Sequence, residues 1–185
     1  MNKNKTPVVS GAGTALLVID VQQGLFERAT PIYKADEVLM NINALIDRAR
    51  EAGVPVIFIQ HSNDNTLMKG TPQWKFHPRI QPAVGEPVIH KLEGNAFTGT
   101  TLAEVLKERN AATLVLTGLV THGCVKSTTL GALELGYRVT LVTDGHSSFS
   151  PEAPSLIEKW NKELAKKGAE LKPAAQIIFQ KRAEG

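Results

Sequence analysis

Residues 113–124, Thr-Leu-Val-Leu-Thr-Gly-Leu-Val-Thr-His-Gly-Cys, contain the pattern that decides the fold. The apolar, β-branched run at 113–117 is typical of a buried parallel strand, and Gly118 ends it. Helical spacing of apolar residues follows over 124–135, up to Gly136. Open α/β sheets are built from such strand-to-helix units and bind their ligands where the strands end. We therefore predict a functional site at this turn.

Cys124, the only cysteine in the 185 residues, stands at the start of the predicted helix. Unpaired N–H groups and the positive end of the helix dipole favour the thiolate, which is the nucleophilic form of cysteine. A buried structural cysteine is the plainer alternative, because free cysteines are often buried. That role fits the middle of a strand better than a turn, so we interpret Cys124 as a candidate nucleophile.

The composition limits the classes of function. The hydrophobic fraction of 42% and the charged fraction of 21% are ordinary for one globular domain, which we place at 13–185 after a flexible N-terminal tail at 1–12. A net charge of +3 with 5% aromatic residues argues against nucleic-acid binding. The apolar run at 15–21 is too short for a membrane span. A single cysteine excludes an internal disulfide, which suits a cytoplasmic protein.

Strand and helix patterns alternate along the chain with short connections. Strands are predicted at 14–20, 54–60, 87–91, 113–117, 138–143 and 175–179, and helices at 36–52, 101–109, 124–135 and 150–168. Thr101 and Glu104 form a capping-box pattern, and Ser150 and Pro151 are expected as N-cap and first residue of the last helix. This order predicts a doubly wound parallel sheet with helices on both faces. The segment 61–86 is expected to be a lid or a subunit contact.

Three ionisable residues lie where predicted strands end. Asp20 closes the first strand, Lys91 closes the third, and Cys124 follows the fourth. A carboxylate beside a thiol can accept its proton, and a nearby ammonium can stabilise negative charge. Each residue alone is weak support, since strand-end aspartates are common in turns and lysines are usually solvated. Their convergence on one edge of the sheet predicts a catalytic site.

Three blocks of the sequence resemble the isochorismatase-like cysteine hydrolases. These are Ala15-Leu-Leu-Val-Ile-Asp20-Val-Gln22-Gln-Gly-Leu-Phe26, Lys91-Leu-Glu-Gly-Asn-Ala-Phe97-Thr-Gly-Thr100, and Gly118-Leu-Val-Thr121-His-Gly-Cys124-Val with its continuation to Gly136-Tyr137-Arg-Val. Asp144-Gly145 stands where the family usually has Asp-Ala. The blocks follow the family's order and cover most of 14–150.

The resemblance implies a six-stranded sheet in three α/β/α layers and an Asp20, Lys91 and Cys124 triad. It also implies a cis peptide bond between Val120 and Thr121. The backbone N–H groups of Thr121 and Cys124 would form an oxyanion hole. Gln22, Phe26 and Phe97 match positions that line the pocket in relatives. The implied reaction is hydrolysis of a small amide, ureide or lactam through a thioester, with no cofactor, in a homo-oligomer.

The histidines suggest two further hypotheses, a pairing of His122 with Cys124 and a metal site. His122 precedes Cys124 by two residues, a spacing that usually points side chains apart in a tight turn, and His90 is expected on the opposite side of its strand from Lys91. His146 is expected at the rim of the site. His61, Asp64 and His77 are candidate metal ligands. Metal-dependent nicotinamidases of this superfamily, however, have Asp-x-His after the second strand, where this chain has Gln60-His61-Ser62-Asn63, so we predict no metal.

Three other functions compete with amide hydrolysis. A vinyl-ether hydrolase of the isochorismatase type needs the Asp20 acid but no thiol nucleophile, so Cys124 argues against it. A non-catalytic binding protein that retains the fold would not need Asp20, Lys91 and Cys124 together. A thiol redox sensor is the weakest hypothesis, because the chain has no resolving cysteine.

Overall fold

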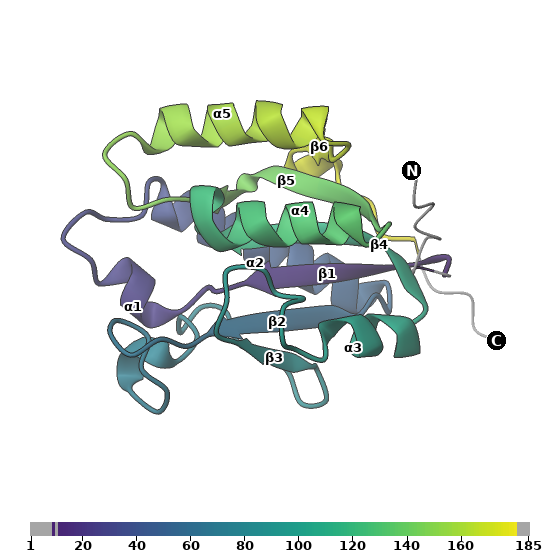
Figure 1. Cartoon of the computed structure of the whole chain (residues 1–185), viewed down its shortest axis with the longest axis horizontal. Helices are drawn as coiled ribbons and strands as arrows, with labels where there is room; N and C mark the ends of the chain where they lie inside the picture. The colour runs from purple at the N-terminus through teal and green to yellow at the C-terminus, as the bar shows by residue number, and fades with distance from the viewer. Residues whose placement is uncertain (1–8, 10, 181–185) are drawn as a thin grey trace, which may run out of the picture.

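The fold is a six-stranded parallel sheet covered by helices on both faces (Figure 1). The structure, a computed structural model, describes residues 9 and 11–180, so most of the predicted tail at 1–12 lies outside the described residues. The strand order is β3-β2-β1-β4-β5-β6. The strands are β1 Gly13–Ile19, β2 Val56–His61, β3 Val88–Lys91, β4 Ala111–Leu119, β5 Arg138–Ser147 and β6 Glu170–Lys172. The predicted three-layer α/β/α class is confirmed.

The helices cover both faces of the sheet, and each packs against the apolar side chains of the face that it covers. They are α1 Gln23–Phe26, α2 Ala35–Glu51, α3 Leu102–Glu108, α4 Lys126–Glu134 and α5 Ala153–Lys166, with short helical turns at Pro72–Trp74, Thr121–Val125 and Ala174–Gln176. Leu17 and Ile19 of β1 pack in a core with α3, α4 and α5, whereas Leu16 and Val18 pack with α2. A strand buried on both faces needs this continuous apolar run.

No helix within residues 9 and 11–180 is both long enough and apolar enough to cross a lipid bilayer.

The predicted strand at 175–179 is wrong, because the sixth strand lies earlier, at Glu170–Lys172. The peptide groups after it bond to side chains instead of to a neighbouring strand. Arg48 of α2 donates to the carbonyl oxygens of Ala174 and Ile177, both at 2.8 Å. Asp144 Oδ1 accepts the Ala174 N–H at 2.7 Å.

The predicted helix starts also need correction. The last helix begins at Ala153, after the expected Ser150 and Pro151, with Glu152 at the N-cap. Thr101 caps α3 with no side-chain hydrogen bond. The Leu102 N–H instead donates to Thr100 Oγ1 at 3.2 Å. From the sequence alone, either of two adjacent threonines can be the capping residue, and only the local backbone conformation decides which one caps the helix.

Gly118 allows the two central strands to come together where the site lies. It pairs with Ile19 of β1 and has φ +119°, and a Cβ at this position would lie 2.0 Å from the Ile19 carbonyl oxygen. No side chain fits there without moving the backbone of β1, which carries Asp20 directly after Ile19.

We expect Gly118→Ala to lower the free energy of unfolding by about 4 kcal/mol or more, because it combines an unfavourable φ with a backbone clash. Urea-induced unfolding measures the change. Gly85→Ala is the matched control, because Gly85 has φ +86° and nothing within 4 Å of its Cβ position. It should cost only about 1–2 kcal/mol. Equal losses in the two variants would contradict the close approach of β4 and β1.

Candidate active site

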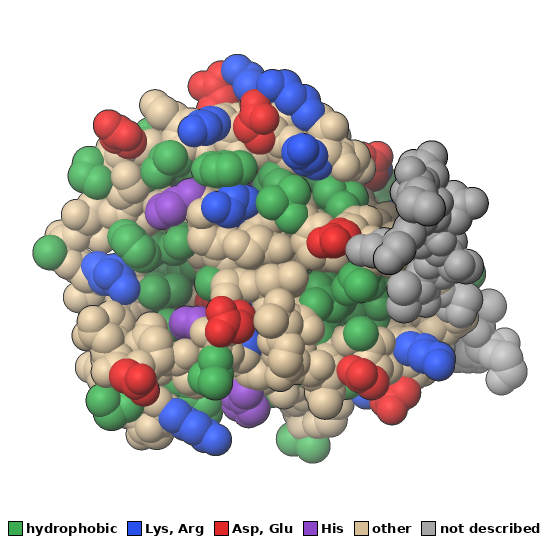
Figure 2. Space-filling view, viewed as in Figure 1, with side chains coloured by type: hydrophobic (Ala, Val, Ile, Leu, Met, Phe, Trp, Pro, Cys, Tyr) green, Lys and Arg blue, Asp and Glu red, His purple; other side chains and the backbone are tan. Residues whose placement is uncertain are grey.

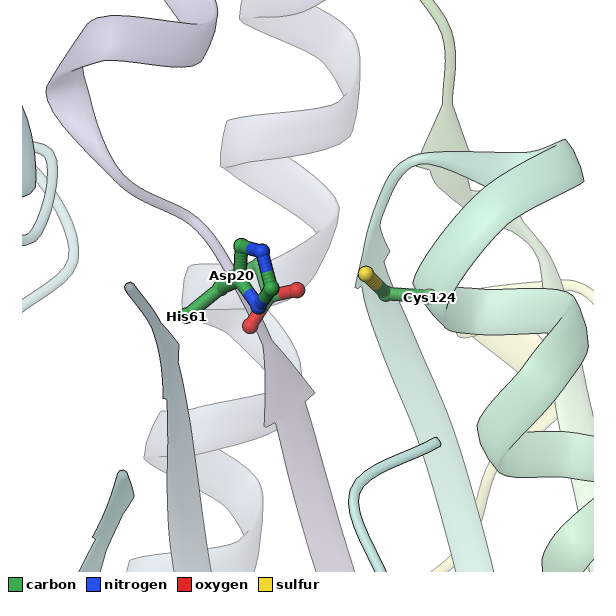
Figure 3. Close-up of side chains that lie close together, drawn as sticks. All are labelled: Asp20, His61 and Cys124. Carbon is green, nitrogen blue, oxygen red and sulfur yellow. The ribbon is translucent and has the colours of Figure 1, made fainter. Parts of the chain in front are cut away.

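The carboxyl ends of three strands bring Asp20, Lys91 and Cys124 into contact. Asp20 directly follows β1, Lys91 is the last residue of β3, and Cys124 lies in the turn Thr121–Val125 after β4. Lys91 Nζ lies 2.9 Å from Asp20 Oδ2 and 3.1 Å from Cys124 Sγ. The side chains of Lys91 and Asp20 are buried. Figure 3 shows the Cys124 sulfur facing Asp20 across the gap between β1 and the turn.

A fourth residue, His61, belongs to this cluster. Its Nδ1 lies 3.1 Å from Lys91 Nζ. Ligand atoms of His61, Asp20 and Cys124 all lie within 4.8 Å of one another (Figure 3). From the sequence, His61 was considered only as a metal ligand, and its contact with Lys91 was not predicted. The position of His61 at the end of β2, in register with Lys91 on β3, could have indicated this contact.

The three N–H bonds of the Lys91 ammonium are all used by acceptors other than Asp20. They point to His61 Nδ1, to Cys124 Sγ, and to the Glu93 carbonyl oxygen at 3.0 Å. The contact between Lys91 and Asp20 is therefore an ion pair, and neither Asp20 oxygen has a hydrogen-bond partner among the described residues. Because buried carboxylate oxygens normally accept hydrogen bonds, Asp20 retains the capacity to take a proton or to bind a donor.

The resting Cys124 is a thiol, in contrast to the thiolate expected from a helix start. Burial and the charge of Asp20 raise the pKa of Cys124 to about 12, and Lys91 offsets only part of this rise. Burial also raises the pKa of Asp20, although Lys91 acts to lower it. The expectation was wrong because Cys124 lies in the turn Thr121–Val125, before α4 begins at Lys126, and is largely removed from water. Ionisation of the thiol thus requires a proton acceptor in the site.

The turn that carries Cys124 is held by a buried chain of hydrogen bonds. Thr121 Oγ1 lies 2.8 Å from His146 Nδ1, and His146 Nε2 lies 2.9 Å from Asn161 Oδ1 on α5. Burial lowers the pKa of His146 to about 4, so the ring is neutral at pH 7. Nε2–H then donates to Asn161, and the Thr121 hydroxyl donates to Nδ1. His146 is buried behind the turn, not at the rim of the site as expected.

The cis peptide bond lies between Leu119 and Val120, one residue before the predicted position at Val120 and Thr121. The strand β4 runs to Leu119, beyond the predicted end at 117, so the cis bond joins the last residue of the strand to Val120, before the turn begins at Thr121. The Val120 carbonyl oxygen accepts the N–H groups of Gly123 and Val125 at 3.0 and 3.3 Å.

Gln22 and Phe26, predicted to line the pocket, occupy supporting positions. Gln22 is buried, and its Nε2 donates to the carbonyl oxygens of His61 at 2.9 Å and Trp74 at 2.8 Å, while its Oε1 accepts the His61 N–H at 2.8 Å. Phe26 stacks near His77 with ring centroids 4.5 Å apart. Gln22 thus ties the end of β2 to the 61–86 segment.

Phe97, predicted to line the pocket, packs on an aromatic neighbour. Its ring stacks on Tyr137, with centroids 5.6 Å apart. Tyr137 directly precedes β5, at the edge of the parallel sheet opposite to Cys124. The pocket position was implied by the family resemblance and stays a prediction.

The other histidines lie outside the catalytic contacts. His90 stacks on Trp74, with centroids 5.5 Å apart, on the exposed side of β3, as expected from strand alternation. His122 lies 3.3 Å from Ser148 Oγ and near Phe149, which supports the expectation that it does not pair with Cys124.

The predicted metal ligands His61, Asp64 and His77 do not come together. Asp20, His61 and Cys124 form the one group of potential ligands found among the described residues. Lys91 Nζ already lies within 3.1 Å of an atom of each of them. A metal ion at the same point would repel this buried ammonium, so the donor set does not suit a metal.

A small apolar cluster includes the two residues directly before the turn that carries Cys124. Leu25, Ile32, Leu67 and Leu119 form a small cluster with Phe26, Trp74, Val120 and Phe149. Figure 2 shows hydrophobic side chains in a hollow on the half of this face where α1 lies. Beside it, a cavity of about 320 Å³ is lined by Ser62, Asn63, Lys91 and Leu92, among others. Among the residues that the structure describes, Lys91 and Asp20 are the buried charged groups of the site.

The Isochorismatase domain matches residues 14–171. A streptothricin hydrolase from Streptomyces noursei is 33% identical over 159 residues, which are 84% of this chain and 58% of that protein. Nicotinamidase 3 from Arabidopsis thaliana is 30% identical over 154 residues, 75% of each chain. The crystal structure of an isochorismatase from Pseudomonas putida KT2440 superposes with a TM-score of 0.83 at 29% identity, covering 91% of this chain and 93% of that one. The chain belongs to the isochorismatase family of hydrolases.

Proposed function

We propose that the protein is a metal-independent cysteine hydrolase that cleaves a C–N bond of a small amide, ureide or lactam. The observation that carries this proposal is the contact of Cys124 Sγ with Lys91 Nζ at 3.1 Å, next to an Asp20 carboxylate with no hydrogen-bond partner among the described residues. A thiol, a proton acceptor and a fixed positive charge are the groups that acyl transfer through a thioester requires.

The reaction proceeds through a thioester. The Cys124 proton moves to Asp20 while the sulfur forms a bond to the carbonyl carbon, and the carbonyl π electrons move to the oxygen. When the tetrahedral intermediate collapses, the C–N bond breaks and the nitrogen takes the proton from Asp20. Ammonia or an amine leaves. Water then attacks the thioester and gives a proton to Asp20, the C–S bond breaks, and the sulfur regains its proton. The second product is a carboxylic acid.

Two features stabilise the charges that develop. The Lys91 ammonium lies beside both the sulfur and the carboxylate, so it stabilises negative charge on either one. The backbone N–H groups of Thr121 and Cys124 are proposed to bind the oxyanion. His146 and Asn161 hold the Thr121 side of this turn from behind.

Vinyl-ether hydrolysis is the second candidate, and the name of the family favours it. It uses Asp20 as an acid and leaves the thiol without a role, whereas Cys124 contacts the two charged groups of the site. The contacts therefore favour the amide reaction.

Hydrolysis by the purified protein across a panel of small amides, ureides and lactams tests the proposal. Ammonia release is measured for primary amides and ureides, and mass spectrometry detects the addition of one water to a lactam, which releases no ammonia. Streptothricin and nicotinamide belong in the panel because two relatives are named for their hydrolysis. We expect hydrolysis of at least one compound. A protein that cleaves no C–N bond in the panel but cleaves isochorismate would overturn the proposal in favour of vinyl-ether hydrolysis.

A further inference from the structure

His61 has a fixed proton position. Lys91 is a donor without acceptor capacity, so the contact between its Nζ and His61 Nδ1 at 3.1 Å makes Nδ1 the acceptor. Burial and the charge of Lys91 lower the pKa of His61 below its usual value, so the ring is neutral at pH 7. The single ring hydrogen is therefore on Nε2.

The backbone of His61 is held on both sides. Gln22 accepts its N–H and donates to its carbonyl oxygen, at 2.8 and 2.9 Å. The Ser62 N–H donates to the Lys91 carbonyl oxygen at 2.9 Å, which continues the pairing of β2 with β3. With the backbone fixed and Nδ1 bonded to Lys91, the imidazole cannot turn over without losing that hydrogen bond.

The remaining donor of His61 is unused. Nε2 has no hydrogen-bond partner among the residues that the structure describes, although His61 is half-buried. Figure 3 shows one ring nitrogen beside the Asp20 carboxylate and the other directed away from it, past the ends of the strands. One nitrogen of this ring lies within 4.8 Å of both Asp20 and the Cys124 sulfur, so the imidazole borders the point of attack.

We propose that His61 contacts the substrate by donating Nε2–H to a second acceptor oxygen, next to the carbonyl group that Cys124 attacks. This inference rests on the proposed function and narrows its substrate class. The oxygen belongs to a neutral group, because Asp20 and Glu93 both place negative charge near the ring against the single positive charge of Lys91. Ureides, imides and diamides carry such an oxygen, and simple alkyl amides do not.

Nitrogen-15 NMR of the imidazoles tests the inference without turnover. The probe ligand is malonamide, and the matched ligand is 3-methylbutanamide, which has a similar shape but a branched alkyl group in place of the second amide. Cys124→Ala protein, which cannot form the thioester, is titrated with each. We expect His61 in the neutral Nε2–H form and a shift of Nε2 with malonamide only. A hydrogen on Nδ1, or the same response to both ligands, would overturn the inference.

Variants of His61 give the kinetic test. We expect His61→Leu to lower kcat/KM for malonamide by about 10- to 100-fold more than that for 3-methylbutanamide, since only malonamide loses a hydrogen bond, whereas both reactions lose the contact of His61 with Lys91. His61→Gln can still donate from a similar position and should retain part of the preference. Glu158→Gln, on the exposed surface of α5, is the control and should match the parent protein.

The two proposals fail in different ways. Absence of any amide hydrolysis, with the expected tautomer and the malonamide-specific shift present, contradicts the proposed function and leaves the role of His61 in binding supported. Amide hydrolysis that His61→Leu lowers equally for both compounds contradicts the role of His61 in selection and leaves the proposed function supported.

Discussion

Cys124→Ala should abolish amide hydrolysis while leaving the protein folded. We expect kcat to fall by about 10⁴-fold or more, because removal of a covalent nucleophile leaves only binding and oxyanion stabilisation. The side chain contacts Lys91 and is partly buried, so the variant loses one hydrogen bond and a small apolar contact. A change of about 1 kcal/mol in the free energy of unfolding is expected from this loss.

The measurement is ammonia release on the best compound of the panel, with thermal unfolding as the check on folding. Cys124→Ser is the matched variant, because it keeps the size and a hydrogen-bonding group but supplies a far weaker nucleophile at the same point. It should be nearly as inactive as Cys124→Ala. If both variants retain hydrolysis, water must be the attacking group and the thioester path is wrong.

Asp20→Asn should lower turnover and yet make the Cys124 thiol easier to ionise. Turnover should fall by about 10²- to 10⁴-fold, because the proton acceptor and donor of the proposed reaction is lost. The thiol, however, should ionise more easily. Burial and the charge of Asp20 raise the pKa of Cys124; the variant loses the charge of Asp20 and keeps Lys91, which lowers this pKa. The pH at which iodoacetamide reacts half-maximally with Cys124 should therefore move below about 12.

The pH dependence of activity gives a second readout for Asp20. Asp20 must be ionised to accept the thiol proton, and burial raises its pKa above 3.8. Activity of the wild-type protein should therefore rise with pH through this raised pKa and fall below it, and this acid limb should be absent from the residual activity of Asp20→Asn. A variant that retains the limb, or whose thiol reacts only at higher pH than wild type, would contradict the assigned role.

Stability should respond to the same group in the opposite direction. Because the folded-state pKa of Asp20 is raised, the protonated carboxyl favours the folded protein. This contribution is fully present below the unfolded value of about 3.8 and is lost as pH rises through the folded-state pKa. The carboxylate that serves the reaction at neutral pH is thus held at some cost to folding.

Much of the fold followed from apolar patterning. The continuous apolar run of β1 and the single apolar stripe of α2 indicated a strand buried on both faces and a helix on one of them, and the structure has both. The sixth strand was misplaced because 175–179 has strand-like residues, but the Ile177 carbonyl oxygen in this segment bonds to Arg48, a partner 129 residues away in sequence. Contacts of that range leave no local pattern.

For the same reason, some residues of the site were predicted from the sequence and others were not. Asp20, Lys91 and Cys124 end or follow strands, and parallel topology alone brings such ends to one edge of a sheet. His61 meets the same condition, but its importance depends on its register with Lys91, which no single-sequence pattern specifies. Phe97 lies six residues from Lys91 and yet packs at the opposite edge.

The sequence by itself determined the doubly wound sheet, the order of its strand and helix units, and the residue types that meet at its carboxyl edge. It could do so because apolar periodicity and strand ends are local properties of the chain. Only the tertiary structure decided the protonation of Cys124, the free oxygens of Asp20 and the orientation of His61. The protonation of Cys124 depends on burial. The free oxygens of Asp20 and the orientation of His61 depend on which of the four acceptors around the Lys91 ammonium group receive its three hydrogens. Both conditions arise only when distant segments pack together.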